Sequence, residues 1–207
     1  MYKLFFCVII LLLYGCNHSA FSSKWTKEKA PASFRARFET SKGNFDVEVT
    51  RSLSPLAADR FYQLVRHHYF DRVLFYRVVP GFVAQFGNID TAVTKKWEQH
   101  IVKDEPVVAG NLKGTISFAR SVANSRGAHL FINLNDNRRL DTSSYSGVTG
   151  FPVFGKVTNG MDVVTSLYSG YANATMDISD SLGGDRVRFM ALFPKLDSVK
   201  KAYLLKQ

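Results

Sequence analysis

Short apolar runs separated by turn residues form the pattern of this chain from residue 34 onward. Residues 34–40 and 44–50 alternate apolar and polar positions on either side of Gly43, which predicts a β-hairpin with this glycine in its turn. Further strands are expected at 73–79, 82–86, 115–119, 130–132, 153–158 and 186–193. This succession favours an all-β domain. Because closure into a barrel protects the edges of an antiparallel sheet most completely, we expect a closed barrel with helices at its ends.

Helical spacing is confined to a few segments. Residues 54–70 read as one amphipathic helix, with Ser54 as its cap and Pro55 at its first position. The positions expected on its buried face are Ala57, Phe61, Leu64, Val65 and His68. A short helix is expected within 160–168, and a surface helix in the tail, where Leu196, Val199, Tyr203 and Leu204 are spaced helically.

Two longer segments, 89–110 and 133–150, interrupt the strands and are rich in polar residues. Long loops on a compact domain are often binding loops, so both are candidate parts of a site.

The first 15 residues differ from the rest, with Lys3 followed by an apolar run from Leu4 to Tyr14. This run is shorter than the roughly 20 residues that span a bilayer, and it is typical of a secretory signal peptide. "LYGC", ending at Cys16, resembles the lipobox of bacterial lipoproteins, which implies that Cys16 is the lipidated first residue of the mature chain. The alternative is that Cys7 and Cys16 are small buried residues of an N-terminal helix.

The lipoprotein interpretation divides the chain into a signal peptide (1–15), a lipidated cysteine and tether (16–33), a domain (34–193) and a C-terminal extension (194–207). With Cys16 acylated, no cysteine is left for a disulfide. Several acyl chains would anchor the domain at a membrane. We expect it in the bacterial cell envelope, facing the periplasm. Asn17, rather than aspartate, after the cysteine mildly favours the outer membrane.

Composition is that of a folded protein of one domain, with 207 residues, 46% hydrophobic and 21% charged, and a formal net charge of +10. Lys and Arg are scattered and are not interleaved with aromatic residues, so nucleic-acid binding is not expected. The excess charge is better explained by solvation and by attraction to an anionic membrane beneath the tether.

One arginine stands inside the apolar stretch "FYRVVPGFVAQFG", residues 75–87. Strand alternation would place Arg77 on one face with Val73, Phe75 and Val79. If the next strand pairs with it, the amide of Gln85 comes close to the guanidinium. Taken alone, Arg77 could be an ordinary half-buried arginine with a carboxylate partner.

Several segments, taken in order, are more specific. "FYRVVPGFVAQFGN", "GTISFAR", "NSRGAHLFINLNDNRRLD" and "GFPVFGKVTNGMDVV" resemble the cyclophilin family of peptidyl-prolyl isomerases over about residues 34–193. The resemblance implies an eight-stranded antiparallel barrel capped by two helices. It also implies a catalytic group of Arg77, Phe82 and Gln85. The substrate-binding residues that it implies are Val83, Ala119, Arg120, Ser121, His129, Phe131, Leu140 and Phe151.

These residue types suit the isomerisation of X-Pro bonds, which requires no nucleophile, metal or cofactor. At the twisted transition state the prolyl nitrogen regains a lone pair, and Arg77 would donate to it. Phe82, Val83, Phe131 and Leu140 would hold the proline ring in an apolar pocket. The expected partners are therefore proline-containing polypeptides, bound by a monomer.

The chain departs from the family pattern at Phe86, His129, Leu130 and Arg139, which stand where glycine, glutamine, phenylalanine and an aromatic residue are usual. Loss of the aromatic at Arg139 should weaken binding of the large cyclic inhibitors of the family. The departures also leave two other hypotheses: a module that binds proline peptides without useful turnover, and a purely structural surface lipoprotein. His129 and the pair His67-His68 lack the accompanying ligands of a metal site.

Overall fold

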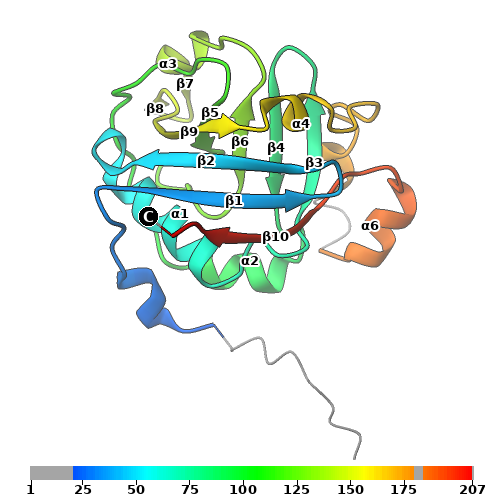
Figure 1. Ribbon diagram of the computed structural model, residues 1–207, viewed down its shortest axis with the longest axis horizontal. Coiled ribbons are helices and arrows are strands. Elements are labelled where there is room, and N and C mark those ends of the chain that lie inside the picture. Colours follow the sequence, from blue (N-terminus) through cyan, green and yellow to red (C-terminus); the bar gives the residue numbers. More distant parts are fainter. Residues whose placement is uncertain (1–20, 180–183, 207) are drawn as a thin grey trace, which may run out of the picture.

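The computed structural model describes residues 21–179 and 184–206, and its main element is one antiparallel sheet of eight strands (Figure 1). The strands are β1 (Ser33–Thr40), β2 (Asn44–Thr50), β3 (Leu74–Val79), β4 (Val83–Gly87), β5 (Thr115–Phe118), β6 (Leu130–Asn133), β9 (Val153–Asn159) and β10 (Val199–Leu204). Their order is β10-β1-β2-β9-β5-β6-β4-β3. In Figure 1, β1, β2 and β10 run across the view while β3, β4 and β6 run nearly at right angles to them, so the sheet curves into a half-barrel.

The expected closed barrel is not what the sheet forms, because its order ends at β10 and β3. These two edges meet at an isolated bridge between Leu74 and Ser198, flanked by hydrogen bonds from Phe75 N to Asp197 O and from Val199 N to Val73 O, both 2.9 Å. Among the described strands, β3 and β10 share this single bridge and no regular ladder. The predicted eight strands and their antiparallel pairing are confirmed. The prediction that the sheet closes into a barrel was wrong.

The β1–β2 hairpin is confirmed. Phe38 pairs with Phe45, and their rings stack at 4.9 Å in the core. Thr40 N donates to Gly43 O at 2.8 Å, and Gly43 has φ 135°, a value that residues with a Cβ rarely adopt.

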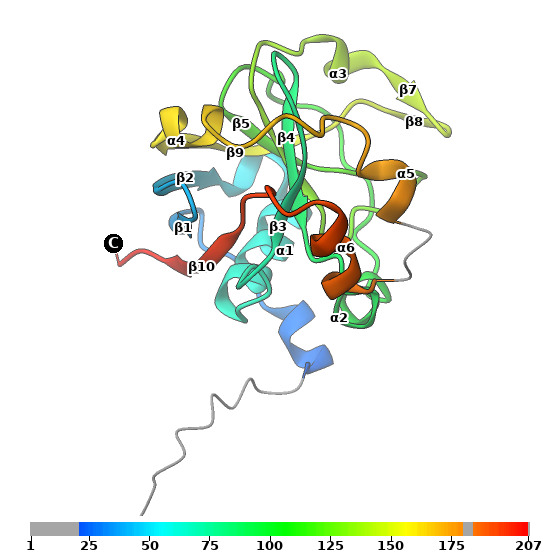
Figure 2. The ribbon, with the colours of Figure 1, turned by 90° about the vertical axis from the view of Figure 1, so that its right-hand side faces the viewer.

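The remaining elements are helices and one small hairpin. They are η1 (Ser23–Lys27), η2 (Arg51–Leu53), α1 (Pro55–Arg66), α2 (Thr91–Glu98), α3 (Arg139–Thr142), α4 (Met161–Thr165), α5 (Met176–Ser179), α6 (Arg186–Leu192) and the hairpin β7 (Ser144–Tyr145) and β8 (Val148–Thr149). The two polar interruptions thus carry α2 in the first and α3 with the small hairpin in the second. Figure 2 shows α5 and α6 on the side of the molecule that also carries β3 and β4.

Helix α1 begins where the sequence predicts it, with Ser54 at the N-cap position and Pro55 as the first helical residue, and it ends at Arg66 instead of continuing to residue 70. Ser54 makes no capping bond through its side chain and instead donates its hydroxyl hydrogen to Glu105. The Glu105 carboxylate accepts from the backbone N–H groups of Leu56 and Ala57, at 2.8 and 3.2 Å. An anion from a distant loop therefore stabilises the positive end of this helix. His68 lies beyond the helix with φ 58° and is exposed, so it does not belong to the buried face.

Two late segments exchange their expected structures. Residues 186–192 form α6, not a strand, because Phe189 and Phe193 pack on one side, four residues apart, while Val187 is 82% exposed. The tail forms β10, not a helix, and pairs with β1 along the sheet edge. The register shift between Glu39 and Thr40 interrupts regular pairing there. Because of this shift, buried and exposed positions along β10 do not alternate with the period of two that marks a regular strand.

Residues 21–33, expected in the tether, pack against the domain. The ring of Trp25 stacks on His67 at 4.0 Å, and Gln63 Nε2 donates to Glu28 O at 2.6 Å. Cys7, Cys16 and the signal segment lie outside the described residues. Within residues 21–179 and 184–206, no helix is long and apolar enough to cross a membrane.

Candidate active site

The guanidinium of Arg77 is held by two amide side chains. Arg77 and Gln85 are direct partners in the β3–β4 ladder, and Arg77 Nη1 donates to Gln85 Oε1 at 3.1 Å. Arg77 Nε donates to Asn173 Oδ1 at 2.8 Å. Among the side chains that the structure describes, no carboxylate forms an ion pair with Arg77. The predicted approach of Gln85 is confirmed, and the carboxylate-paired alternative finds no support there.

Strict alternation along β3 was wrong. Phe75 and Val78 both pack in the main core, whereas Leu74 and Tyr76 pack in a second cluster with Phe189 and Phe193. The register shift between Leu74 and Arg77 reverses the faces between these positions. Arg77 therefore points away from the core that Phe75 fills, and it lies half-buried at the sheet surface.

A cavity of about 310 Å³ opens beside this guanidinium. Its lining consists of Arg77, Phe82, Val83, Gln85, Ala119, Arg120, Ser121, Phe131, Leu140, Phe151 and Met176. All but Met176 are residues that the sequence predicts for the site, brought together from β3, β4, β6, α3 and the loops between strands. The rings of Phe131 and Phe151 meet edge to face at 5.7 Å, so the apolar walls are fixed by their own packing.

Phe82 is positioned by the tight Pro80-Gly81 turn. Phe82 N donates to Val79 O at 3.0 Å, and Gly81 has φ 71°. The carbonyl of Phe82 accepts from Leu134 N and from Asn137 Nδ2, both at 2.8 Å. Asn137 is a buried side chain that the sequence did not single out. It ties the turn to the loop after β6 and so fixes the aromatic wall of the cavity.

His129 lies in a neighbouring cavity of about 440 Å³, not in the one beside Arg77. Its Nδ1 is 3.0 Å from the Tyr76 hydroxyl, and that hydroxyl also accepts from Gln85 Nε2 at 2.8 Å. Burial lowers the pKa of His129 to about 4 and raises that of the Tyr76 hydroxyl. A neutral chain of hydrogen bonds therefore runs from His129 through Tyr76 and Gln85 to Arg77.

Phe86 does not narrow the cavity. It is fully buried on the opposite face of β4 from Gln85, and its ring packs at 5.0 Å from Phe75 and at 5.8 Å from both Phe38 and Phe70. Gly87, by contrast, is required for space, because a Cβ there would overlap the ring of His129.

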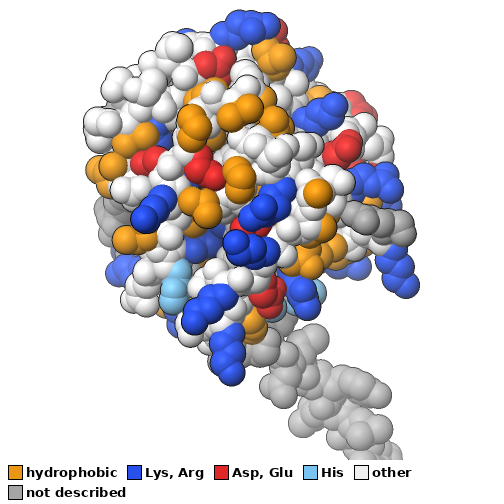
Figure 3. All heavy atoms as spheres, turned by 90° about the vertical axis from the view of Figure 1, so that its left-hand side faces the viewer, with side chains coloured by type: hydrophobic (Ala, Val, Ile, Leu, Met, Phe, Trp, Pro, Cys, Tyr) orange, Lys and Arg blue, Asp and Glu red, His pale blue; other side chains and the backbone are white. Residues whose placement is uncertain are grey.

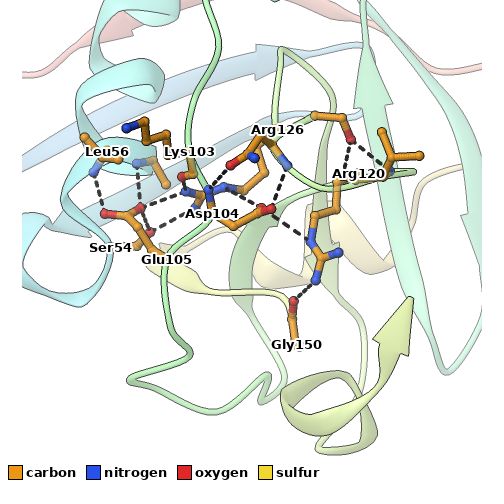
Figure 4. Close-up of polar contacts among 12 residues, drawn as sticks. Ser54, Leu56, Lys103, Asp104, Glu105, Arg120, Arg126 and Gly150 are labelled. Atoms are coloured by element: carbon orange, nitrogen blue, oxygen red, sulfur yellow. Dashed lines mark hydrogen bonds and ion pairs between the residues drawn. The ribbon is translucent and has the colours of Figure 1, made fainter. Parts of the chain in front are cut away.

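Arg120 forms one wall of the cavity and is committed to structural contacts (Figure 4). Its guanidinium donates to Gly150 O and lies 4.7 Å over the ring of Phe151. Asp104 Oδ1 lies 3.8 Å from Arg120 Nε and 3.6 Å from Arg126 Nε, and only 1% of each arginine side chain is exposed. One carboxylate therefore serves two buried guanidinium groups and joins the loops that border the site.

The rim carries a second cation. The guanidinium of Arg139, at the sequence position where the family pattern has an aromatic residue, lies 4.6 Å over the ring of Phe82. Arg77 lies 5.5 Å from the same ring. In the described part of the chain, no group of three or more His, Cys, Asp or Glu side chains could hold a metal ion.

Comparison with known proteins agrees with this geometry. The sequence profile of the family described as "Cyclophilin type peptidyl-prolyl cis-trans isomerase/CLD" matches residues 35–181. The chain is 33% identical over 140 residues to a peptidyl-prolyl cis-trans isomerase of Acinetobacter baylyi, a match that covers 67% of this chain and 73% of that protein. Peptidyl-prolyl cis-trans isomerase A of Dickeya dadantii is 34% identical over 140 residues, with the same coverage.

Among solved structures, a cyclophilin type peptidyl-prolyl cis-trans isomerase of Cryptosporidium parvum superposes with a TM-score of 0.62 at 18% identity, over 84% of this chain and 99% of that one. A second structure of the same protein, in the presence of the dipeptide Ala-Pro, gives a TM-score of 0.60. At this identity the likeness concerns the fold. The profile match and the relatives above 30% identity establish that the chain belongs to the cyclophilin-type peptidyl-prolyl cis-trans isomerase family.

Proposed function

We propose that this chain catalyses the cis–trans isomerisation of X-Pro bonds in exported proteins while anchored at a membrane surface. The observation that carries the catalytic part is the Arg77 guanidinium, held by neutral amides at the mouth of an apolar cavity large enough for a proline ring. The family and the names of its relatives support the same activity.

The chemistry needs an electrostatic catalyst and a rigid frame. Rotation about an amide breaks its resonance and meets a barrier of about 20 kcal/mol. The nitrogen regains a lone pair only while the bond is twisted, so a donor aimed at that nitrogen stabilises the transition state more than either ground state.

Arg77 has the properties of such a donor. Burial lowers its pKa, but a guanidinium stays protonated throughout the physiological range. Its partners Gln85 and Asn173 are uncharged, so they orient the group without neutralising it. The charge therefore acts in a partly desolvated site, where it interacts more strongly than in water.

The cavity would hold the proline ring against Phe82, Phe131 and Phe151 while the peptide on either side is anchored. A fixed ring lets rotation occur about one bond rather than through motion of the whole peptide. This frame explains why the aromatic walls are locked by their own contacts.

Exchange spectroscopy by NMR on a cis/trans proline peptide tests the activity, with the full-length protein in mild detergent as wild type and as Arg77→Ala. We expect wild type to accelerate exchange and the variant to lose nearly all of that acceleration. If wild type changed the chemical shifts of the peptide without accelerating its exchange, the result would instead favour a receptor for proline-containing segments. Arg139 over Phe82 motivates that second candidate, because it occupies the rim where a peptide would lie.

The membrane context rests on residues 1–16 of the sequence, where a signal-like apolar run precedes Cys16. Basic side chains on the described surface would be attracted to an anionic membrane. On the face in Figure 3 they lie in several separate groups, with acidic residues between them.

Expression in a bacterium with radiolabelled palmitate tests the anchor. Wild type should be labelled and sediment with the envelope, and Cys16→Ser should be unlabelled. Unlabelled wild type in the cytoplasm would contradict the proposal.

A further inference from the structure

Asn173 reaches the candidate catalytic arginine from a segment that contributes no strand to the sheet. The segment runs from the end of α4 to α5, and Asn173 is 96 positions after Arg77 in the chain. Its Oδ1 accepts from Arg77 Nε at 2.8 Å, on the opposite side of the guanidinium fork from the bond between Nη1 and Gln85.

The segment is fixed in place on both sides of Asn173. Thr175 is fully buried, and its hydroxyl donates to the carbonyl of Tyr76, the neighbour of Arg77, at 2.5 Å. Tyr171 packs edge to face on Phe193 at 5.0 Å. Within the segment, Ala174 N donates to Tyr171 O and Met176 N to Asn173 O, both at 2.9 Å. Asn173 is thus presented by ordered backbone rather than by a free loop.

The bond has a consequence for the arginine itself. A free arginine side chain samples many rotamers, and ordering it costs conformational entropy. With Gln85 on one edge and Asn173 on the other, that cost is met before substrate arrives. Both partners are neutral, so the positive charge of the fork is left for the substrate.

We propose that Asn173 is a positioning residue of the isomerase, which holds the Arg77 fork in its reactive orientation without neutralising its charge. This inference rests on the proposed function of Arg77. It extends the active site to residues 171–176, a segment that also supplies Met176 to the cavity wall.

Three variants of the full-length protein in detergent test the proposal: Asn173→Ala, Asn173→Asp and the control Asn44→Ala. Asn44 is an exposed asparagine at the start of β2. For Asn173→Ala we expect the exchange rate at saturating peptide to fall about 3- to 10-fold, as suits one exposed hydrogen bond to a charged group. The affinity of Asn173→Ala for the peptide should change less than twofold, and its melting temperature should match that of wild type. The control Asn44→Ala should match wild type in rate, affinity and melting temperature.

A spectroscopic signal separates positioning from simple packing. The Arg77 Nε–H resonance should exchange slowly with water in wild type and rapidly in Asn173→Ala. In Asn173→Asp the Nε–H resonance should stay protected, because a carboxylate still accepts the bond. The catalysed rate of cis–trans isomerisation should nevertheless fall, because the added negative charge partly neutralises the positive charge of Arg77.

The proposal is overturned if Asn173→Ala leaves the rate and the Nε–H signal unchanged, or if its rate loss follows a loss of folded protein. An Asp variant as active as wild type would contradict the need for a neutral partner. If wild type itself did not accelerate exchange, the proposed function would fail instead, while the Nε–H signal would still report whether Asn173 holds the fork.

Discussion

Tyr76 and His129 are hydrogen-bonded at 3.0 Å between the tyrosine hydroxyl and Nδ1, and Tyr76 directly precedes the proposed catalytic residue Arg77. The same hydroxyl accepts a bond from Gln85 Nε2 at 2.8 Å. Burial lowers the pKa of His129 to about 4, so the imidazole is neutral near pH 7, and in the tautomer with its proton on Nε2 the Nδ1 atom accepts the Tyr76 hydroxyl hydrogen. Where the family pattern has glutamine, this chain has a half-buried imidazole, and protonation of its Nδ1 would remove the acceptor for the Tyr76 hydroxyl hydrogen.

The first prediction concerns acid stability. The pKa of His129 is about 4 in the folded protein and near 6.5 when the chain unfolds, so the unfolded state binds the extra proton first. The stabilisation of the folded state that neutral His129 contributes is fully present above pH 6.5 and is lost as the pH falls toward 4. Between pH 7 and pH 4.5, the free energy of unfolding measured in urea should fall by about 2 kcal/mol less for His129→Gln than for wild type. Equal losses in both proteins would contradict this role.

The second prediction concerns Phe86. Because its ring is fully buried among Phe38, Phe70 and Phe75, Phe86→Ala should lower the free energy of unfolding by about 3–5 kcal/mol. Affinity for a proline peptide, measured by NMR titration where the variant is still folded, should stay within twofold of wild type. A large gain in affinity with little loss of stability would mean that the ring obstructs the cavity after all.

Asp104 provides the third prediction. Asp104→Asn removes the carboxylate that faces both Arg120 and Arg126, and it leaves two buried guanidinium groups with less opposing charge. We expect a loss of about 3 kcal/mol in the free energy of unfolding. The control Asp162→Asn, in the exposed first turn of α4, should change it by less than about 1 kcal/mol. Similar small effects of both changes would show that the arginines do not depend on Asp104.

The fourth prediction concerns Arg139. Its guanidinium covers Phe82 at the rim, where a broad aromatic surface would otherwise be available. Arg139→Trp should therefore raise affinity for the large cyclic inhibitors of the family at least tenfold, through added apolar contact. Isothermal titration of wild type and variant measures the change, and tight binding by wild type alone would refute the argument.

Local patterns predicted what depends on neighbouring residues. The hairpin around Gly43 and the approach of Gln85 to Arg77 follow from alternation and a short turn, and both are present. Alternation failed on β3, where a register shift turned Arg77 to the other face from Phe75. It also failed at the C-terminus, where 186–192 is a helix and 199–204 is a strand.

The remaining features depend on tertiary contacts that no local pattern encodes. Glu105 caps α1 from a loop about 50 positions away in the chain. Nothing in the sequence around Glu105 distinguishes it from the other acidic residues. Asn173 lies in a segment with neither strand nor long helix periodicity, so nothing near it in the chain indicates Arg77 as its partner. The family resemblance located Arg77, Phe82 and Gln85, but it gave no sign of these supports.

The most direct test of the central claim is the exchange rate of a proline peptide at saturation with wild type and with Arg77→Lys, together with the affinity of each protein for the peptide. Lysine keeps a positive charge but cannot be held by Gln85 and Asn173 in one fixed fork. We predict that the catalysed rate falls by about 100-fold while affinity stays within threefold, as for loss of one oriented donor to a transition state. An unchanged rate, or a fall in affinity that accounts for the whole loss, would contradict catalysis by the oriented guanidinium of Arg77.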